Sequence, residues 1–314
     1  MYGAIIGDIV GSKYEFHNIK TKDFPFVSPG CSYTDDSIMT LAVASALLKT
    51  RDEMAQGKED ADFRRKLIEE MQALGRRFPW PQGGYGGRFG AWLRAKDPQP
   101  YNSYGNGSAM RVSPCGLIAV TLEEALALAK ASAEVTHNHP EGIKGAQAVA
   151  AAIFLARTGK GKEEIGDYLR ANFYPLDRTL DEIRPSYGFS ESCQKTVPEA
   201  ITAFLESTSY EDAIRNAISL GGDSDTLGAI TGAIAWSYYR FNTEEIDSGE
   251  KPGSIWPKWC AELIREYRID EMLPTDFVEL IDHFDEARML RQGSFGRMSC
   301  CTSILPDCRP IEKG

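Results

Sequence analysis

Apolar residues recur along the chain at helical spacing, and this pattern defines most of the elements that the sequence predicts. Two stretches, residues 2–11 and 227–239, are apolar on nearly all sides, so we predict that each forms a buried helix. A third stretch, residues 38–48, has the same character. The other predicted helices are more amphipathic or more polar, and they cover residues 51–78, 89–96, 122–133, 142–156, 199–206, 212–220, 254–268 and 275–291.

The sequence contains no internal repeats, no long strand-like alternation and no segment that reads as a linker. We therefore predict one compact all-α domain over residues 1–295, which is long enough to bury a large core. The remaining residues, 296–314, contain three cysteines among prolines and glycines, and we expect this tail to be poorly ordered.

The composition and the charge argue against several classes of function. A formal net charge of -10 argues against a general nucleic-acid or anionic-membrane binder, because an acidic surface repels both. No apolar stretch reaches membrane-spanning length, and the N-terminus lacks the basic region of a signal peptide. The seven cysteines form no CxxC pair, so neither a zinc site nor a redox motif is indicated. We expect a cytoplasmic monomer, and the net charge does not exclude a small nucleotide or a modified protein bound at a local site.

Two clusters of acids and hydroxyls each precede one of the apolar helices. Asp35 and Asp36 precede the predicted helix 38–48. Asp223 and Asp225 follow two glycines and precede the predicted helix 227–239. Each acid could simply cap a helix, because capping oxygens accept bonds from the free N–H groups there. A cap uses one side chain, however, and clustered oxygens are what Mg²⁺ prefers. The two clusters could therefore meet and hold one or two metal ions.

Two further acids lie near the first predicted helix. Asp8 falls towards its C-terminal end, where a negative charge opposes the helix dipole, and such local conflicts often mark sites. Glu15 follows in a polar segment and is a candidate acid or base, although a solvent-exposed loop carboxylate is the simpler interpretation.

Two loops, residues 82–88 and 102–108, interleave glycines with tyrosine and small polar residues. Backbone N–H groups exposed by glycine can bind phosphates, and a tyrosine can stack on a base or a ribose. Neither loop matches a P-loop or a dinucleotide fingerprint, so an ordinary turn remains an alternative. His137 and His139 follow, and beside so many carboxylates they are better suited to substrate contact or capping than to metal binding.

Taken together, these motifs resemble those of the ADP-ribosylglycohydrolases, a family that includes the dinitrogenase reductase-activating glycohydrolase and the vertebrate ADP-ribosyl-acceptor hydrolases. The resemblance covers roughly residues 1–240, in the family's order. It rests on Gly7-Asp8-Ile9-Val10-Gly11, Glu15, Thr34-Asp35-Asp36, Gly84-Tyr85-Gly86-Gly87, Ser103-Tyr104-Gly105-Asn106-Gly107-Ser108, Thr136-His137 and Gly222-Asp223-Ser224-Asp225-Thr226.

The resemblance implies an all-helical domain with a cleft that holds two Mg²⁺ ions, with Mn²⁺ as an alternative. The implied metal ligands are Thr34, Asp35, Asp36, Asp223, Asp225 and Thr226. The implied substrate contacts are Gly86, Ser103, Tyr104, Gly105, Asn106 and His137. Glu15 matches an acid that some members place over the metals.

The implied activity is hydrolysis of the bond between C1″ of ADP-ribose and an acceptor side chain. Glu15 and Asp35 are the candidates for proton transfer. The sequence does not choose between an arginine and a serine acceptor. A hydrolase for a non-protein ADP-ribosyl substrate and an inactive ADP-ribose-binding or structural member of the family are the alternatives.

Overall fold

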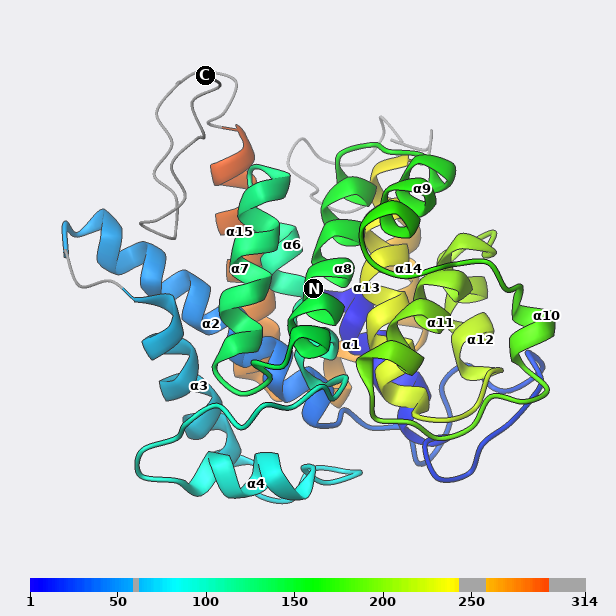
Figure 1. Cartoon of the computed structure of the whole chain (residues 1–314), viewed down its shortest axis with the longest axis horizontal. Coiled ribbons are helices and arrows are strands. Elements are labelled where there is room, and N and C mark those ends of the chain that lie inside the picture. The colour runs from blue at the N-terminus through cyan, green and yellow to red at the C-terminus, as the bar shows by residue number, and fades with distance from the viewer. Residues whose placement is uncertain (59–61, 243–257, 294–314) are drawn as a thin grey trace.

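The computed structural model describes residues 1–58, 62–242 and 258–293, and these residues confirm the predicted all-α class because they contain helices and no strand. Figure 1 shows the arrangement. The helices are α1 (Tyr2–Ser12), α2 (Asp35–Ala55), α3 (Phe63–Arg77), α4 (Gly87–Arg94), α5 (Gly107–Met110), α6 (Ser113–Ile118), α7 (Leu122–Glu134), α8 (Pro140–Arg157), α9 (Lys162–Asn172), α10 (Leu180–Ile183), α11 (Cys193–Leu205), α12 (Tyr210–Ile218), α13 (Ser224–Asn242), α14 (Lys258–Glu266), the 3₁₀ helix η1 (Ile269–Met272) and α15 (Thr275–Gly293).

The centre of the fold is an antiparallel contact in which the backbones of α1 and α13 touch. A Cβ atom added at Gly7 would lie 2.0 Å from the carbonyl oxygen of Gly228, and one at Gly11 would lie 2.3 Å from that of Ser224. Gly3 continues the same face of α1 at four-residue spacing and meets α13 in the same way. This contact fixes the first turn of α13 beside the C-terminal end of α1.

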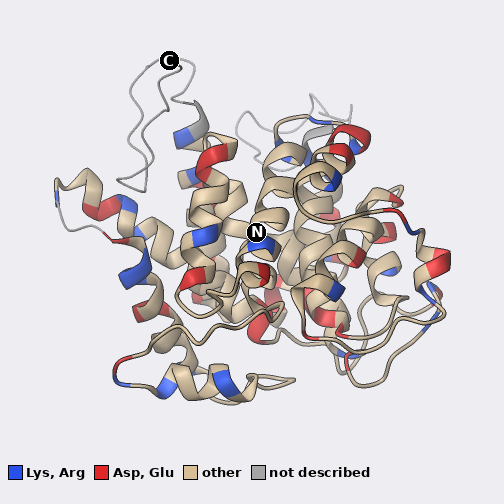
Figure 2. Ribbon diagram, viewed as in Figure 1, with Lys and Arg blue, Asp and Glu red and all other residues tan. Residues whose placement is uncertain are grey.

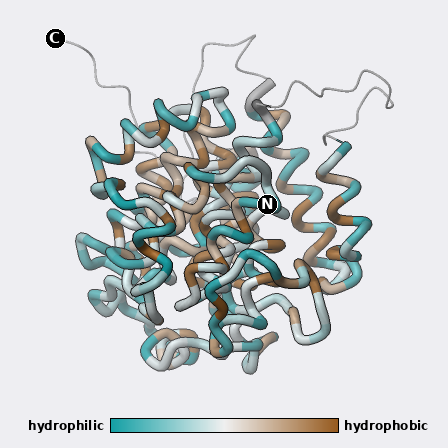
Figure 3. The backbone as a smooth tube through the Cα atoms, turned by 90° about the vertical axis from the view of Figure 1, so that its right-hand side faces the viewer, coloured by the Kyte–Doolittle hydropathy of each residue, from teal (hydrophilic) through white to brown (hydrophobic). Residues whose placement is uncertain are grey.

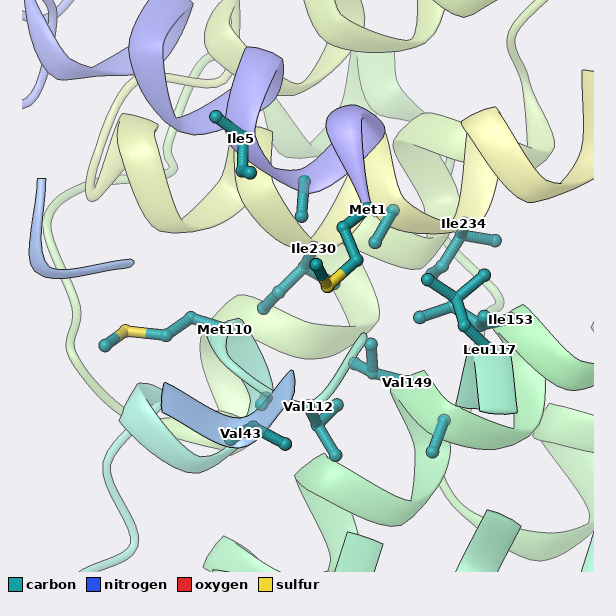
Figure 4. Packing of buried hydrophobic residues seen from close by; sticks show 14 of the residues in the cluster. Met1, Ile5, Val43, Met110, Val112, Leu117, Val149, Ile153, Ile230 and Ile234 are labelled. Atoms are coloured by element: carbon teal, nitrogen blue, oxygen red, sulfur yellow. The ribbon is translucent and has the colours of Figure 1, made fainter. Parts of the chain in front are cut away.

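The core surrounds this helix pair. α8, α11 and α12 pack on α13, whereas α2 packs on α3 and α15. Figure 4 shows apolar side chains from several of these helices meeting in one cluster, among them Ile5 of α1, Val43 of α2, Val149 and Ile153 of α8, and Ile230 and Ile234 of α13. Because these side chains are almost completely buried, the core holds α1, α2 and α13 in fixed positions.

Most charged residues lie around this core, although several acids and arginines are buried within the fold. α1 carries one charged residue, Asp8, and Figure 2 shows most of the Lys, Arg, Asp and Glu residues on the outer helices. The tube in Figure 3 likewise has many of its most hydrophobic segments in the interior. Among the helices that the structure describes, none has the length and apolar character that a membrane crossing requires.

The structure corrects several predicted boundaries. Residues 49–55 belong to α2, which ends near Gly57, a glycine with a positive φ of 73°, so the predicted helix over 51–78 is two elements. α11 begins at Cys193 rather than at residue 199, although Pro198 lies inside it. α9 was not predicted. The predicted tail 296–314 lies outside the described residues, as do the first four residues of the predicted helix 254–268.

Candidate active site

A cleft of about 530 Å³ opens where the two acid clusters meet. Its walls come from segments far apart in the sequence: the residues after α1, the first turn of α2, the loop 83–86 with the first turn of α4, the loop 103–107, the segment 189–191 and the start of α13. Most of the predicted site residues line it, namely Glu15, Asp35, Asp36, Gly86, Ser103, Gly105, Asn106, His137, Asp223, Asp225 and Thr226.

The first turn of α2 is held by Asp8. The side chain of Thr34 caps the helix by accepting a bond from the N–H of Asp36 at 3.2 Å. The hydroxyl of Thr34 donates to Asp8 at 2.7 Å, and the N–H groups of Thr34 and Ser37 donate to the same carboxylate at 2.9 and 3.1 Å. The conflict that the sequence indicated at Asp8 is therefore resolved, because this acid serves the N-terminus of α2 rather than its own helix.

The start of α13 is shaped by two glycines and tied to α2. Gly221 and Gly222 have positive φ angles of 70° and 77°, which glycine adopts without strain. The side-chain amide of Asn18 fixes this turn, donating to the carbonyl of Gly222 at 2.9 Å and accepting from its N–H at 2.8 Å. The hydroxyl of Thr226 then donates to both carboxylate oxygens of Asp36, at 2.9 and 3.1 Å. The two acid clusters are thus joined directly.

The carboxylates perturb one another strongly. Burial raises the pKa of Asp223 from 3.8 to about 6. Burial and the charge of Asp225 raise the pKa values of Asp35 and Asp36 well above their usual range, and burial and the charge of Asp223 do the same for Asp225. For Glu15, burial comes first and the charge of Asp225 second, and together they raise the pKa to about 8.

This donor set fits divalent cations. Glu15, Asp223 and Asp225 can each offer an oxygen within 4.8 Å of the others, and the Oε2 atom of Glu15 is buried without a hydrogen-bond partner. Buried carboxylates at such spacing either take up protons or share a cation. Clustered carboxylate and hydroxyl oxygens are the ligands that a hard ion such as Mg²⁺ prefers.

The loop 103–107 faces His137, which is neutral. Burial, helped by the positive charges of Arg111 and Arg88, holds the pKa of His137 well below its usual value. Arg111 donates to the hydroxyl of Thr136 at 2.8 Å, and this hydroxyl lies 2.7 Å from Nδ1 of His137. When this hydroxyl donates to Nδ1, the proton of the neutral ring lies on Nε2. Nε2 faces Gly105 and can donate to a ligand there.

Three predicted residues occupy positions that the sequence did not suggest. The amide of Asn106 donates to Asp223 at 2.7 Å and to Thr196 at 3.1 Å, so this side chain supports the acid cluster. Thr34 is completely buried in the α2 cap and does not line the cleft. The ring of Tyr104 is 53% exposed and packs against His139, with 5.4 Å between ring centroids. Their roles as ligands or substrate contacts stay predictions.

Aromatic residues also line the cleft, and of these only Tyr85, in the motif Gly84-Tyr85-Gly86-Gly87, was part of the resemblance. Tyr85, Phe89 and Tyr101 place aromatic rings in the cleft near the glycine loops, and the guanidinium of Arg88 lies 4.8 Å from the ring centroid of Tyr101. These rings offer a stacking surface of the kind that we expected from the tyrosines of the two glycine loops. A tyrosine beside a glycine loop was the available signal, but spacing alone could not say which ring turns inward.

The sequence profile of the ADP-ribosylglycohydrolases matches residues 1–282. The chain belongs to the ADP-ribosylglycohydrolase family. It is similar to "ADP-ribosylhydrolase ARH3" of Homo sapiens, with 27% identity over 76% of this chain and 83% of the relative. It is also similar to "ADP-ribosylarginine hydrolase Tri1" of Pseudomonas putida (strain GB-1), with 28% identity over 76% of this chain and 69% of the relative.

The fold has a solved counterpart. A structure titled "ADP-ribosylglycohydrolase-related protein complex" matches with a TM-score of 0.62 and 23% identity, covering 93% of this chain and 95% of that one. The likeness confirms the predicted helical fold of the ADP-ribosylglycohydrolases. Membership of the family places the chain among enzymes that hydrolyse a glycosidic bond of ADP-ribose.

Proposed function

We propose that this ADP-ribosylglycohydrolase is a Mg²⁺-dependent enzyme that releases ADP-ribose from a modified amino-acid side chain, arginine or serine, by cleaving the bond at C1″. The observation that carries the proposal is the convergence of Glu15 and the two acid clusters, from segments about two hundred residues apart, beside a glycine loop and a neutral histidine. The name of the Pseudomonas putida relative supports an ADP-ribosylated side chain as the substrate class.

The residues that would hold two Mg²⁺ ions, or Mn²⁺ in their place, are the acids Asp35, Asp36, Asp223 and Asp225, with the hydroxyl of Thr226. Thr34 is the weakest member of the predicted set, because its hydroxyl already donates to Asp8 and accepts from Asp36 within the helix cap. When bound, such ions would neutralise the carboxylates, fix the ribose hydroxyls and polarise a water molecule.

The protein supplies the proton transfers. Burial and the charge of Asp225 raise the pKa of Glu15 to about 8 in the metal-free cleft, and its carboxyl lines the cleft, so it is the first candidate to give a proton to a departing atom or to take one from water. Asp35 is the alternative, since it also lines the cleft and its pKa is raised. The partly buried positions of these acids limit their solvation by bulk water, which strengthens their effect.

The protein also binds the nucleotide end. Nε2 of His137 is a donor suited to a diphosphate, and Arg88 adds a positive charge, whereas the N–H groups of Gly105 and Asn106 already donate to Oγ of Ser103 and to the carbonyl of Glu191. A Cβ atom at Gly105 would lie 3.2 Å from Oγ of Ser103 and 3.3 Å from Nε2 of His137, so the loop has no spare room. We therefore expect Gly105→Val to abolish ADP-ribose binding.

The deciding experiment measures ADP-ribose release from arginine-linked and serine-linked substrates, in Mg²⁺ and in excess EDTA. Asp225→Asn should abolish release and keep the fold, because the new amide oxygen can still accept the 2.9 Å bond from the N–H of Thr226. Asp167→Asn changes an exposed acid of α9 and serves as the control. Full activity in EDTA would overturn the metal requirement. ADP-ribose binding without any hydrolysis would favour the inactive binding member instead.

A further inference from the structure

Two exposed phenylalanines, Phe16 and Phe189, lie at the part of the cleft that is lined by the acids. Phe16 and Phe189 line the cleft, and their rings stack with centroids 6.3 Å apart and an interplanar angle of 23°. Both side chains are nevertheless exposed, by 66% and 50%. Large apolar side chains that remain exposed beside a cleft are candidates for ligand contact.

The two phenylalanines come from segments that are tied together. The ammonium group of Lys20 donates to the carbonyl of Tyr187 at 2.6 Å, which joins the segment after α1 to the segment before α11. The carbonyl of Glu191 accepts from the N–H of Asn106 at 2.7 Å. The position of Phe189 is thus set by contacts on both sides, so the aromatic pair is part of the cleft wall.

The charge beside this pair is negative. Glu191 lines the cleft with an exposed side chain, and its charge is among those that raise the pKa of the neighbouring Glu15. The two arginines that line the cleft are engaged elsewhere: Arg88 lies over Tyr101, and Arg111 donates to Thr136. The aromatic pair and Glu191 therefore offer π faces and a carboxylate, the two partners that a guanidinium group prefers.

We propose that Phe16, Phe189 and Glu191 form an acceptor subsite that holds the guanidinium group of an ADP-ribosylated arginine. The inference rests on the proposed hydrolase function, and it chooses between the acceptors that this function leaves open. With the ribose at the acids and the diphosphate at the loop 103–107, the acceptor side chain leaves the cleft past this pair. A serine acceptor is neutral and short, so it gains little from these groups.

The reaction that this subsite serves is balanced without a further reactant. The bond between C1″ and a guanidinium nitrogen breaks, and water supplies the hydroxyl group that C1″ receives. The remaining proton of the water goes to the departing nitrogen, so the product is free ADP-ribose and a protonated arginine side chain. Stacking on Phe189 and pairing with Glu191 stabilise the cationic acceptor before and after this step.

The test compares ADP-ribosylated agmatine with an ADP-ribosylserine peptide, using kcat/KM in Mg²⁺. The wild type should prefer the guanidine-linked substrate. Phe189→Ala and Glu191→Gln should each lower kcat/KM for that substrate by about 10-fold, the scale of one cation–π or charged contact, and leave the serine-linked substrate and ADP-ribose affinity little changed. Phe189 is replaced rather than Phe16, because Phe16 adjoins Glu15 and its loss could disturb that candidate acid or base. Trp80→Ala removes a 91% exposed aromatic residue outside the cleft and is the control.

A wild-type preference for the serine-linked substrate would overturn the subsite, as would equal losses on both substrates. A parallel loss of ADP-ribose affinity in Phe189→Ala would assign the aromatic pair to the nucleotide instead. If no substrate is cleaved, the proposed function fails, but calorimetry of agmatine binding to the ADP-ribose-loaded protein still decides the subsite. Binding that weakens in Phe189→Ala and Glu191→Gln supports it, and no agmatine binding to the wild type refutes it.

Discussion

Replacing Gly7 with alanine should separate the two central helices. In the structure the added Cβ atom would lie 2.0 Å from the carbonyl oxygen of Gly228 and 2.4 Å from its carbonyl carbon. Ordinary contact begins at 3.4 Å, so the facing backbone would have to withdraw by about 1.4 Å. Both partners are helix backbones buried in the core, and no flexible side chain can move to relieve the clash.

The expected cost follows from two opposing effects. Alanine gains about 1 kcal/mol over glycine in a helix interior. Overpacking in a core costs about 1–3 kcal/mol, and a backbone-to-backbone clash belongs at or beyond the upper end. We expect Gly7→Ala to reduce the free energy of unfolding by about 2 kcal/mol or more, and to lower the melting temperature by several degrees. Activity should fall further, because the shift moves Asp225 relative to Asp8.

Gly166→Ala is the matched control. Gly166 also lies inside a helix, α9, but a Cβ atom there would meet only the far end of the Arg170 side chain, at 3.2 Å. This variant should be stabilised by up to about 1 kcal/mol and keep full activity. The assay is thermal unfolding by circular dichroism together with ADP-ribose release. If Gly7→Ala is as stable and active as Gly166→Ala, the α1–α13 contact is not as close as described.

Three further predictions concern the acids. Glu15→Gln keeps the shape of the side chain but removes its ionisable carboxyl group, so turnover should fall by about 10²–10⁴-fold. ADP-ribose affinity, measured by calorimetry, should change little, and normal turnover would assign the proton transfer to Asp35. Asn106→Ala removes the amide that holds Asp223, so Mg²⁺ affinity from activity titrations should weaken by about 10–100-fold, whereas an unchanged affinity would make that bond irrelevant to the metal. The pKa of Asp223 is raised from 3.8 to about 6 in the folded protein, so folding favours the protonated form of this carboxyl. In EDTA this contribution to the free energy of unfolding should be complete below about pH 4 and should be lost as the pH rises through 6. Melting curves in EDTA should show this loss in the wild type but not in Asp223→Asn, and Mg²⁺ should restore the stability of the wild type at pH 7; identical pH profiles would refute the linkage.

The sequence predicted the buried helices well for a physical reason. α1 and α13 are apolar on nearly every side, so neither can be stable at the surface. The all-α class was predictable because no other part of the sequence alternates apolar and polar residues as a strand does. Boundaries were less predictable where a helix continues into polar residues, as α2 does after residue 48. There the helix end is set by Gly57, whose left-handed φ angle is visible only in the structure.

The sequence indicated which residues belong to the candidate site, but it did not indicate which of them contact one another. Clustered acids before two buried helices indicated that Asp35, Asp36, Asp223 and Asp225 could meet, and all four line one cleft. The assignment of Asn106 to substrate missed its bond to Asp223, because these residues are 117 positions apart and only the fold brings them together. Phe189 gave no signal at all, since one aromatic residue in a loop has no spacing that could be interpreted.

The assembly of the cleft from distant segments constrains when the protein can become active during its synthesis. Asp8 and the α2 acids leave the ribosome early, but the acids at the start of α13 follow about two hundred residues later, at several residues per second. Until α13 packs on α1, the glycine face of α1 has no partner and the early acids have no counterpart. Such long-range closure slows folding, so a nascent chain that stops short of α13 should expose α1 to chaperones and bind no ADP-ribose.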